Sequence, residues 1–205
     1  MKMEARWKGR AARFWARNKR TVLAFVAGGA AAGLLAGLCA LAVVEFGLYD
    51  IAASQPHNKI VSWALHKTFK RSVKLRAGGE FVPSFTQERV ISGFRQYQAD
   101  CMMCHGGPGV SRADWVKGLE PTPPFLLESG NEWTSSQLDY ILEKGIKMSA
   151  MPSWGETRSK DQIWNLVAFL KALPGISPSQ FAQMQGQYPL DKSPPRQRAT
   201  PEQIH

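Results

Sequence analysis

Cysteine and histidine are scarce in this sequence, which has three cysteines and four histidines among its 205 residues. Cys39 lies in an apolar run, and the other two cysteines, Cys101 and Cys104, are three positions apart. A structural zinc site needs four ligands, usually with a second Cys or His pair, and His57 and His66 are not spaced as such a pair. The shortage of ligands therefore argues against a zinc site.

The sequence also lacks the alternation of apolar and polar residues that is typical of strands. A thioredoxin-like Cys-x-x-Cys site follows a strand in a βαβ pattern, and no such pattern surrounds Cys101. Internal repeats are absent as well. The remaining apolar periodicity is helical, so we expect an all-α fold.

Charge is missing from residues 21–44, a run of twenty-four residues. As a helix, this run is long enough to cross a bilayer core of about 30 Å. Residues 1–20 carry eight basic residues and one acidic residue, and basic residues before a span keep that end in the cytoplasm. We therefore expect a single-pass anchor at 21–44 in a bacterial inner membrane, with the residues that follow on the periplasmic side.

A cleaved signal peptide is the alternative for this run, with residues 40–42 as the cleavage site. The run exceeds the roughly 7–15 apolar residues of a signal peptide, which favours an uncleaved anchor. Gly29, Gly33 and Gly37 lie four residues apart, and such a face of small residues can bring a second membrane helix close. The same spacing is equally consistent with a glycine-rich helix that has no fixed neighbour.

A connector at residues 45–79 combines an apolar helical stripe with six basic residues. Such a helix could lie on the outer membrane surface, pack against the domain that follows, or act as a solvated spacer. The net charge of +10 comes from this connector and from the N-terminal tail. Membrane topology and anionic lipid explain a basic tail beside a span better than nucleic acid does.

The most informative segment is residues 101–105, whose pattern Cys-x-x-Cys-His indicates covalent attachment of one c-type haem. On a helix or a tight turn, Cys101 and Cys104 project from one face, so both sulfurs can reach the two vinyl groups of one porphyrin. His105 then lies over the ring and offers a nitrogen to the iron. Attachment of haem outside the cytoplasm agrees with the orientation expected for the span.

A second axial ligand is expected from the loop that contains Met148 and Met151. A thioether favours ferrous iron and raises the reduction potential. We favour Met151, because Pro152 stiffens the loop beside it; in the alternative, both methionines only pack the haem edge. His57 and His66 precede this region and are interpreted as surface residues.

Residues 80–183 form the expected haem domain, and residues 184–205 are expected to be a disordered tail that carries His205. Glycine- and proline-rich loops separate the helices of this domain. Three helices are predicted from apolar periodicity and capping residues: 86–100, 134–144 and 159–173.

These features resemble membrane-anchored monohaem cytochromes c of the class I type over residues 85–175. Besides the Cys-x-x-Cys-His motif, the resemblance rests on Gly93, Tyr97, the Gly-Pro loop after the motif, Met151, Pro152, Trp154, Trp164 and Phe169. It implies that the first and last helices of the domain cross, with Gly93 allowing close approach to the aromatic face of the last helix. It also implies that Nδ1 of His105 donates to a backbone carbonyl near Pro108.

The function expected from these residues is single-electron transfer by a tethered haem rather than enzymatic turnover, because six-coordinate iron has no open position for substrate. The expected partner is a periplasmic dehydrogenase, a quinol complex or a terminal oxidase. Residues 80–183 carry nine basic and eleven acidic residues, so weak charge steering favours a complex held through the membrane helix. The alternatives are a haem enzyme or gas sensor with a labile sixth ligand, and a structural subunit.

Overall fold

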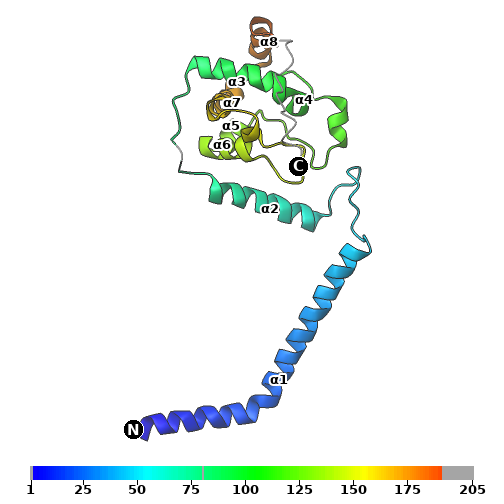
Figure 1. Cartoon of the computed structure of the whole chain (residues 1–205), viewed down its shortest axis with the longest axis vertical. Helices are drawn as coiled ribbons and strands as arrows, with labels where there is room; N and C mark the ends of the chain where they lie inside the picture. Colours follow the sequence, from blue (N-terminus) through cyan, green and yellow to red (C-terminus); the bar gives the residue numbers. More distant parts are fainter. Residues whose placement is uncertain (1, 80, 191–205) are drawn as a thin grey trace, which may run out of the picture. The chain divides into compact units, whose positions relative to one another are not determined.

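The structure, a computed structural model, describes residues 2–79 and 81–190, and it divides into two compact units, Met1–Ala52 and Ala53–His205. The first unit contains helix α1 (Lys2–Glu45), which changes direction within its dark blue N-terminal part (Figure 1). Its segment Asn18–Glu45 is long and apolar enough to cross a membrane, and none of its most apolar window is buried. The run predicted as a membrane anchor is therefore helical throughout.

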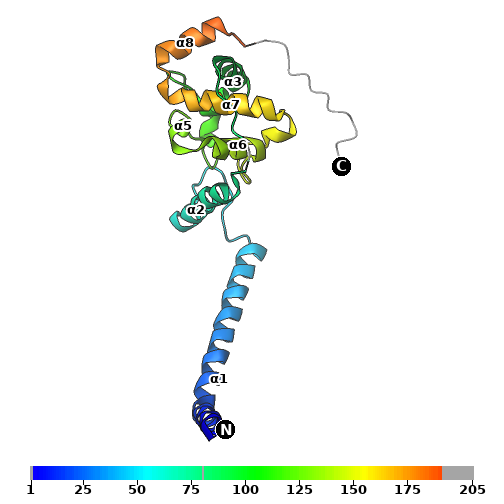
Figure 2. The same cartoon turned by 90° about the vertical axis from the view of Figure 1, so that its left-hand side faces the viewer.

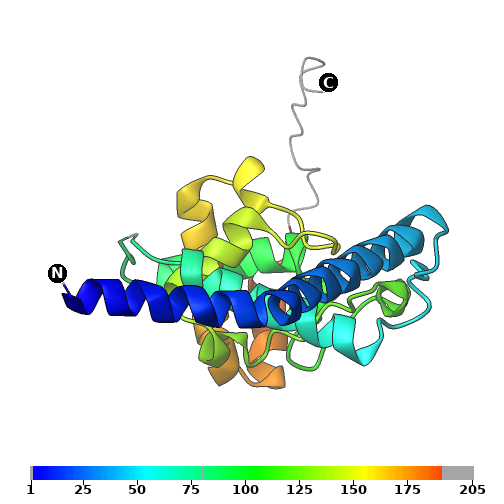
Figure 3. The same ribbon diagram turned by 90° about the horizontal axis from the view of Figure 1, so that it is seen from below.

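Helices make up the second unit, and the described part of the chain contains no strand, which confirms the all-α prediction (Figure 3). Short 3-10 helices lie between them at Asp114–Gly118, Trp154–Glu156 and Leu173–Gly175. The helices are α2 (Lys59–Arg76), α3 (Gln87–Asp100), α4 (Met102–His105), α5 (Ser129–Glu132), α6 (Ser135–Lys144), α7 (Lys160–Ala172) and α8 (Pro178–Gln187).

Side-chain caps begin the three helices that were predicted from the sequence. The Thr86 side chain accepts a hydrogen bond from the Arg89 backbone N–H at the start of α3. Reciprocal capping boxes join Thr134 to Gln137 before α6 and Ser159 to Gln162 before α7. These bonds satisfy backbone donors that a helix start leaves without partners, so the helices begin where the sequence predicts.

Helix α8 continues past residue 183, where the sequence predicted a disordered tail. It begins with a capping box between Ser177 and Gln180 and continues to Gln187, so residues 184–187 are helical rather than disordered. The buried Phe181 ring fixes the helix to the core, with its ring centroid 5.4 Å from that of Phe94. The predicted tail from residue 191 onward, with His205, lies outside the described residues.

The core of the second unit forms where α3 crosses α7 (Figure 2). A Cβ atom on Gly93 would lie 1.9 Å from the Asn165 carbonyl oxygen, so only glycine allows the two backbones this close. The Phe94, Tyr97 and Phe169 rings pack around the crossing, with centroids 5.0–5.5 Å apart. The crossing at Gly93 that the resemblance implied is therefore present.

The connector helix α2 packs against the domain through its C-terminal half. Val73 is buried there, and the Phe69 ring meets the Trp133 ring edge-on at 5.6 Å between centroids. Lys70 pairs with Glu132 at 2.8 Å. In Figures 1 and 2, α2 lies beside α6, as the contacts between the two helices require. The structure therefore shows α2 packed against the domain, which is one of the three roles considered for the connector.

Candidate haem site

The Cys-x-x-Cys-His motif forms one compact turn at the end of α3. Cys101 ends α3, and its carbonyl oxygen accepts hydrogen bonds from the backbone N–H groups of Cys104, at 3.1 Å, and of His105, at 2.9 Å. Cys101 is buried, whereas Cys104 and His105 are partly buried. One short helix, α4, thus brings the two thiols and the imidazole together.

Burial sets the protonation of this group of side chains. It raises the pKa of the Cys101 thiol to about 12, with the nearby Asp100 carboxylate and Cys104 acting in the same direction. Burial also lowers the pKa of His105, assisted by the charge of Arg112 and opposed by a backbone hydrogen bond. A neutral imidazole is the form that binds a metal, so the environment of His105 suits an iron ligand.

His105 is oriented by a carbonyl other than the one expected. Its Nδ1 lies 2.7 Å from the Pro124 carbonyl oxygen, whereas the expected acceptor was near Pro108. The turn around Pro108 closes on itself instead, through two backbone hydrogen bonds between Gly107 and Val110. The prediction of the acceptor was therefore wrong, but the bond itself is present, and it leaves Nε2 free to face a metal.

Arg112 holds the segment that supplies this acceptor. Its guanidinium donates to the Pro123 carbonyl oxygen and lies over the Phe125 ring, 4.1 Å from the ring centroid. Tyr97 fixes the other side of the turn, since its hydroxyl donates to the Gly106 carbonyl oxygen at 2.7 Å. None of these long-range contacts follows a local sequence pattern, which is why Arg112 and Pro124 were missed.

The two methionines of the candidate ligand loop have opposite environments. Met148 is 95% exposed and has a positive φ of 58°, whereas Met151 packs against the hydrophobic core. The Met151 carbonyl oxygen accepts from the Ile146 N–H at 3.1 Å, and its own N–H donates to Ser149 Oγ at 3.2 Å. The loop is thus closed so that Met151 points inward.

Glycine at the end of α6 brings this loop back against the helix. Gly145 has a φ of 66°, and a Cβ atom there would lie 2.6 Å from the Pro152 carbonyl carbon. The Ser153 hydroxyl adds a bond of 2.7 Å to the Glu143 carbonyl oxygen. Pro152 therefore lies in close contact with α6 next to Met151, in accord with the stiff loop expected from the sequence.

Trp154 tests whether these residues fit a bound group. Its indole Nε1 is buried and has no hydrogen-bond partner among the described residues, three positions after Met151. Buried donors are nearly always satisfied, so an acceptor on a bound group would complete this site. Together with the neutral His105 and the inward Met151, this unpaired donor fits a haem.

Arg158 ties the two ends of the site together. Its guanidinium donates to both carboxylate oxygens of Asp100, at 2.8–3.1 Å, next to Cys101. It also lies 5.7 Å from the centroid of the Trp154 ring. This charge-assisted pair joins the end of α3 to the start of α7. The sequence offered no signal for it, because fifty-eight positions separate the partners.

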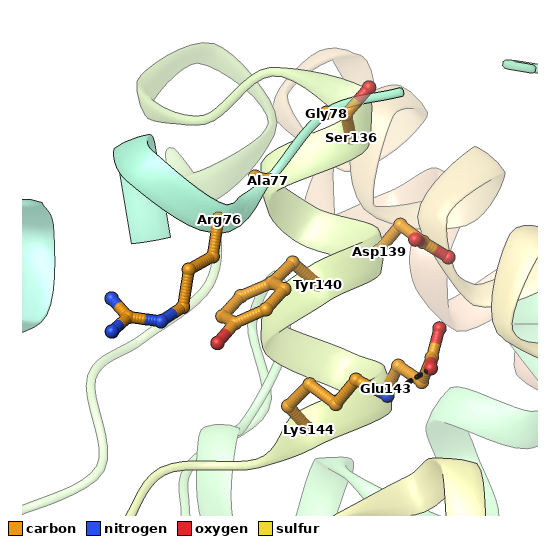
Figure 4. A pocket seen from close by; sticks show the side chains of 8 residues that line it. All are labelled: Arg76, Ala77, Gly78, Ser136, Asp139, Tyr140, Glu143 and Lys144. Atoms are coloured by element: carbon orange, nitrogen blue, oxygen red, sulfur yellow. Dashed lines mark hydrogen bonds and ion pairs between the residues drawn. The ribbon is translucent and has the colours of Figure 1, made fainter. Parts of the chain in front are cut away.

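Other candidate groups lie apart from this site. His57 and His66 precede the domain and belong to the connector, as expected. Within the described residues, no group of three or more His, Cys, Asp and Glu side chains is placed to hold a metal ion. A shallow pocket between the end of α2 and α6, lined by Arg76 and Tyr140 among others, contains no residue of the motif or the methionine loop (Figure 4).

The all-α domain and its Cys-x-x-Cys-His turn define a class I cytochrome c fold. In agreement, residues 88–170 match the family described as cytochrome C oxidase, cbb3-type, subunit III. The match spans less than half of the chain, and it makes residues 88–170 similar to that family of cytochrome subunits. No curated protein and no solved structure matches the chain.

Proposed function

We propose that this protein is a membrane-tethered electron carrier with one c-type haem, rather than an enzyme. Cys101 and Cys104 would hold the haem through their sulfurs, and His105 Nε2 and the Met151 sulfur would be the axial ligands. The bound haem would supply an iron that alternates between the ferrous and ferric states. The observation that carries this proposal is the Cys101–His105 turn with Nδ1 of His105 held by Pro124.

The protein's own residues would contribute orientation and exclusion of water. Pro124 fixes the tautomer of His105, because Nδ1 must carry the proton to donate to a carbonyl oxygen. The buried Phe94, Tyr97 and Phe169 make the surroundings apolar, which favours the less charged state of a redox site. Saturated ligation by His105 and Met151 leaves substrate chemistry to a partner.

The partner would be another component of a redox complex, such as a periplasmic dehydrogenase, a quinol complex or a terminal oxidase. The apolar helix Asn18–Glu45 supports a single-pass location in a bacterial inner membrane, and the basic N-terminal tail supports a periplasmic haem domain. Gly29, Gly33 and Gly37 have open space around them, so this face could accept a partner helix. Gly33→Leu should then reduce co-purification of that partner.

Mass measurement of the denatured full-length protein tests the covalent site. The wild type should carry the added mass of one haem, and the double variant Cys101→Ala with Cys104→Ala should lose it. Cys39→Ala is the matched control and should keep the full added mass. A wild-type protein without added mass would overturn the proposal.

Carbon monoxide separates electron transfer from the alternative of a haem enzyme or gas sensor. The reduced protein at neutral pH should not bind carbon monoxide, because Met151 would occupy the sixth position. Met151→Ala should bind it, since the position is then open. Ready binding by the wild type would favour the sensor or enzyme instead.

A further inference from the structure

Helix α2 carries an exposed face that nothing in the described part of the chain covers. Its packing contacts come from Phe69, Lys70 and Val73 in its C-terminal half. Earlier in the helix, Ile60 and Trp63 are 77% and 66% exposed. Leu65 and Leu75 are exposed as well, so four large apolar side chains are left in solvent on a helix that is otherwise anchored to the domain.

Ile60 and Trp63 lie on one stripe with basic residues. At 3.6 residues per turn, positions 60, 63, 67, 71 and 74 fall on the side of α2 away from Phe69 and Val73. We name this stripe the outward face; its members are Ile60, Trp63, Lys67, Arg71 and Lys74, all exposed. The whole helix contains no acidic residue, so its charge is of one sign.

We propose that the outward face of α2 binds the surface of an anionic lipid bilayer. In helices that lie in the membrane interface, apolar side chains such as Trp enter the headgroup boundary, and Lys and Arg attract anionic lipid. Ile60 and Trp63 would supply the apolar contact, and the basic members of the outward face would supply the charge. Each basic residue near such a surface strengthens binding by about fivefold. Residues 80–183 are nearly neutral by comparison, so the positive charge that attracts lipid headgroups is concentrated in α2.

The tether keeps this face within reach of the bilayer, so the inference rests on the membrane anchoring proposed above. Thirteen residues separate Glu45 from Lys59, and fully extended they span at most about 45 Å. Exposed Phe46, Leu48 and Ile51 lie in this linker and would themselves favour the interface. A short tether raises the effective concentration of α2 at the membrane, so modest affinity suffices.

The consequence is a fixed orientation of the haem domain. Phe69, Val73 and the Lys70–Glu132 pair join α2 to the domain, so α2 cannot lie on lipid without orienting the helices packed against it. The domain would then present one constant side to a redox partner in the same membrane. An acidic protein surface is the competing occupant, and the experiment below separates it from lipid.

Linear dichroism of the haem in aligned bilayers measures this orientation on the full-length, haem-loaded protein. One sample contains phosphatidylcholine alone, and the other contains phosphatidylcholine mixed with phosphatidylglycerol. We expect marked dichroism only in the mixed bilayers, with loss at high salt because screening weakens the attraction. The variant Lys67→Glu with Arg71→Glu should lose it as well, with binding of the face weakened at least about 25-fold.

Arg95→Glu with Lys117→Glu is the matched control, because both residues are exposed and lie outside α2. The control should retain wild-type dichroism. Equal dichroism in both bilayers, or an α2 variant that behaves as the control does, would overturn lipid binding and favour a protein occupant.

A second readout does not need haem. Nitroxide-labelled lipid should strongly quench the fluorescence of Trp63 in mixed bilayers. The Trp63 signal is the difference between the fluorescence of the wild type and that of Trp63→Phe. Absence of haem with quenching retained would contradict only the electron carrier. Haem present without quenching would contradict only the lipid-binding face.

Discussion

Met148 and Met151 are side chains of the same type that lie in one loop but have different environments. Met148 is almost fully exposed, and Met151 packs against the core three residues later. Both can be nominated from the sequence as soft ligands, and the packing shows how different their environments are. The proline at 152 pointed to Met151 for a reason of stiffness, and the close contact of Pro152 with Gly145 agrees with that reason.

Replacing Met151 by alanine should change the haem spectrum and potential. We expect the absorption band of the Met–iron bond to disappear and the reduction potential to fall by a sizeable part of the roughly 0.8 V that axial ligands span. Spectroscopy and a redox titration measure both effects. Met148→Ala is the control and should leave both unchanged; the reverse pattern would assign the ligand to Met148.

At the same scale, the residues that orient the site were beyond the reach of the sequence. Cys101, Cys104 and His105 could be proposed as site residues because attachment chemistry imposes their local spacing. Pro124 and Arg112 act across turns of the chain, and no local rule relates them to His105. A family resemblance supplied the idea of a carbonyl acceptor but placed it near Pro108, since it could not foresee how this loop folds.

Helix starts were predictable because caps are local. The boxes at Thr134 and Ser159 predict the starts of α6 and α7 correctly. Helix α8 also begins with a capping box, at Ser177, but it was not predicted. Polar composition around residues 184–205 outweighed that local signal. Docking of Phe181 on Phe94 is what makes a glutamine-rich segment helical, and packing of this kind is absent from a composition argument.

Alanine at Gly93 should destabilise the crossing of α3 and α7. The new Cβ would overlap the Asn165 carbonyl, so we expect the free energy of unfolding to fall by about 3 kcal/mol. Gly186→Ala, in α8 with open space around it, should change it by about 1 kcal/mol or less, in the stabilising direction. Denaturant unfolding of both variants measures the difference, and equal stability would contradict the close crossing.

Glu143 should contribute to acid sensitivity at the junction of α6 and α7. A hydrogen bond from Lys144 lowers the pKa of Glu143, and a second one from Lys160 acts in the same direction. Lys160 also donates to the Asp139 carboxylate. A lowered folded-state pKa contributes stability above the unfolded pKa, and this contribution is lost as pH falls through the folded value.

Glu143→Gln should therefore lose less stability than the wild type between about pH 5 and pH 3. The effect should be small because the group is partly exposed and solvent screens the pairs. Denaturation at several pH values measures it. Glu156→Gln, an exposed carboxylate in the neighbouring turn, should follow the wild-type profile, and identical slopes for wild type and Glu143→Gln would contradict the assignment.

At the scale of the whole molecule, the sequence predicted two kinds of structure for one physical reason. A helix without charged residues can enter a lipid bilayer, whereas a helix with one apolar and one polar face must pack its apolar face against a core. The helix α1 and the haem domain follow from that difference. The connector was harder to predict, because an amphipathic basic helix can lie on a membrane, on a protein surface or in solvent. Contacts such as that of Phe69 with Trp133 are needed to show what it packs against.

The uncharged run should remain in the mature protein as its anchor. N-terminal sequencing of membrane-extracted protein should find residues upstream of Val43, because the run is longer than a signal peptide requires. The variant Ala40→Leu with Ala42→Leu blocks a cleavage site that needs small residues. An uncleaved anchor predicts masses that differ only by the two Ala→Leu substitutions, whereas a cleaved leader predicts a variant that is heavier by the whole retained leader and a wild type released from membranes by an alkaline wash.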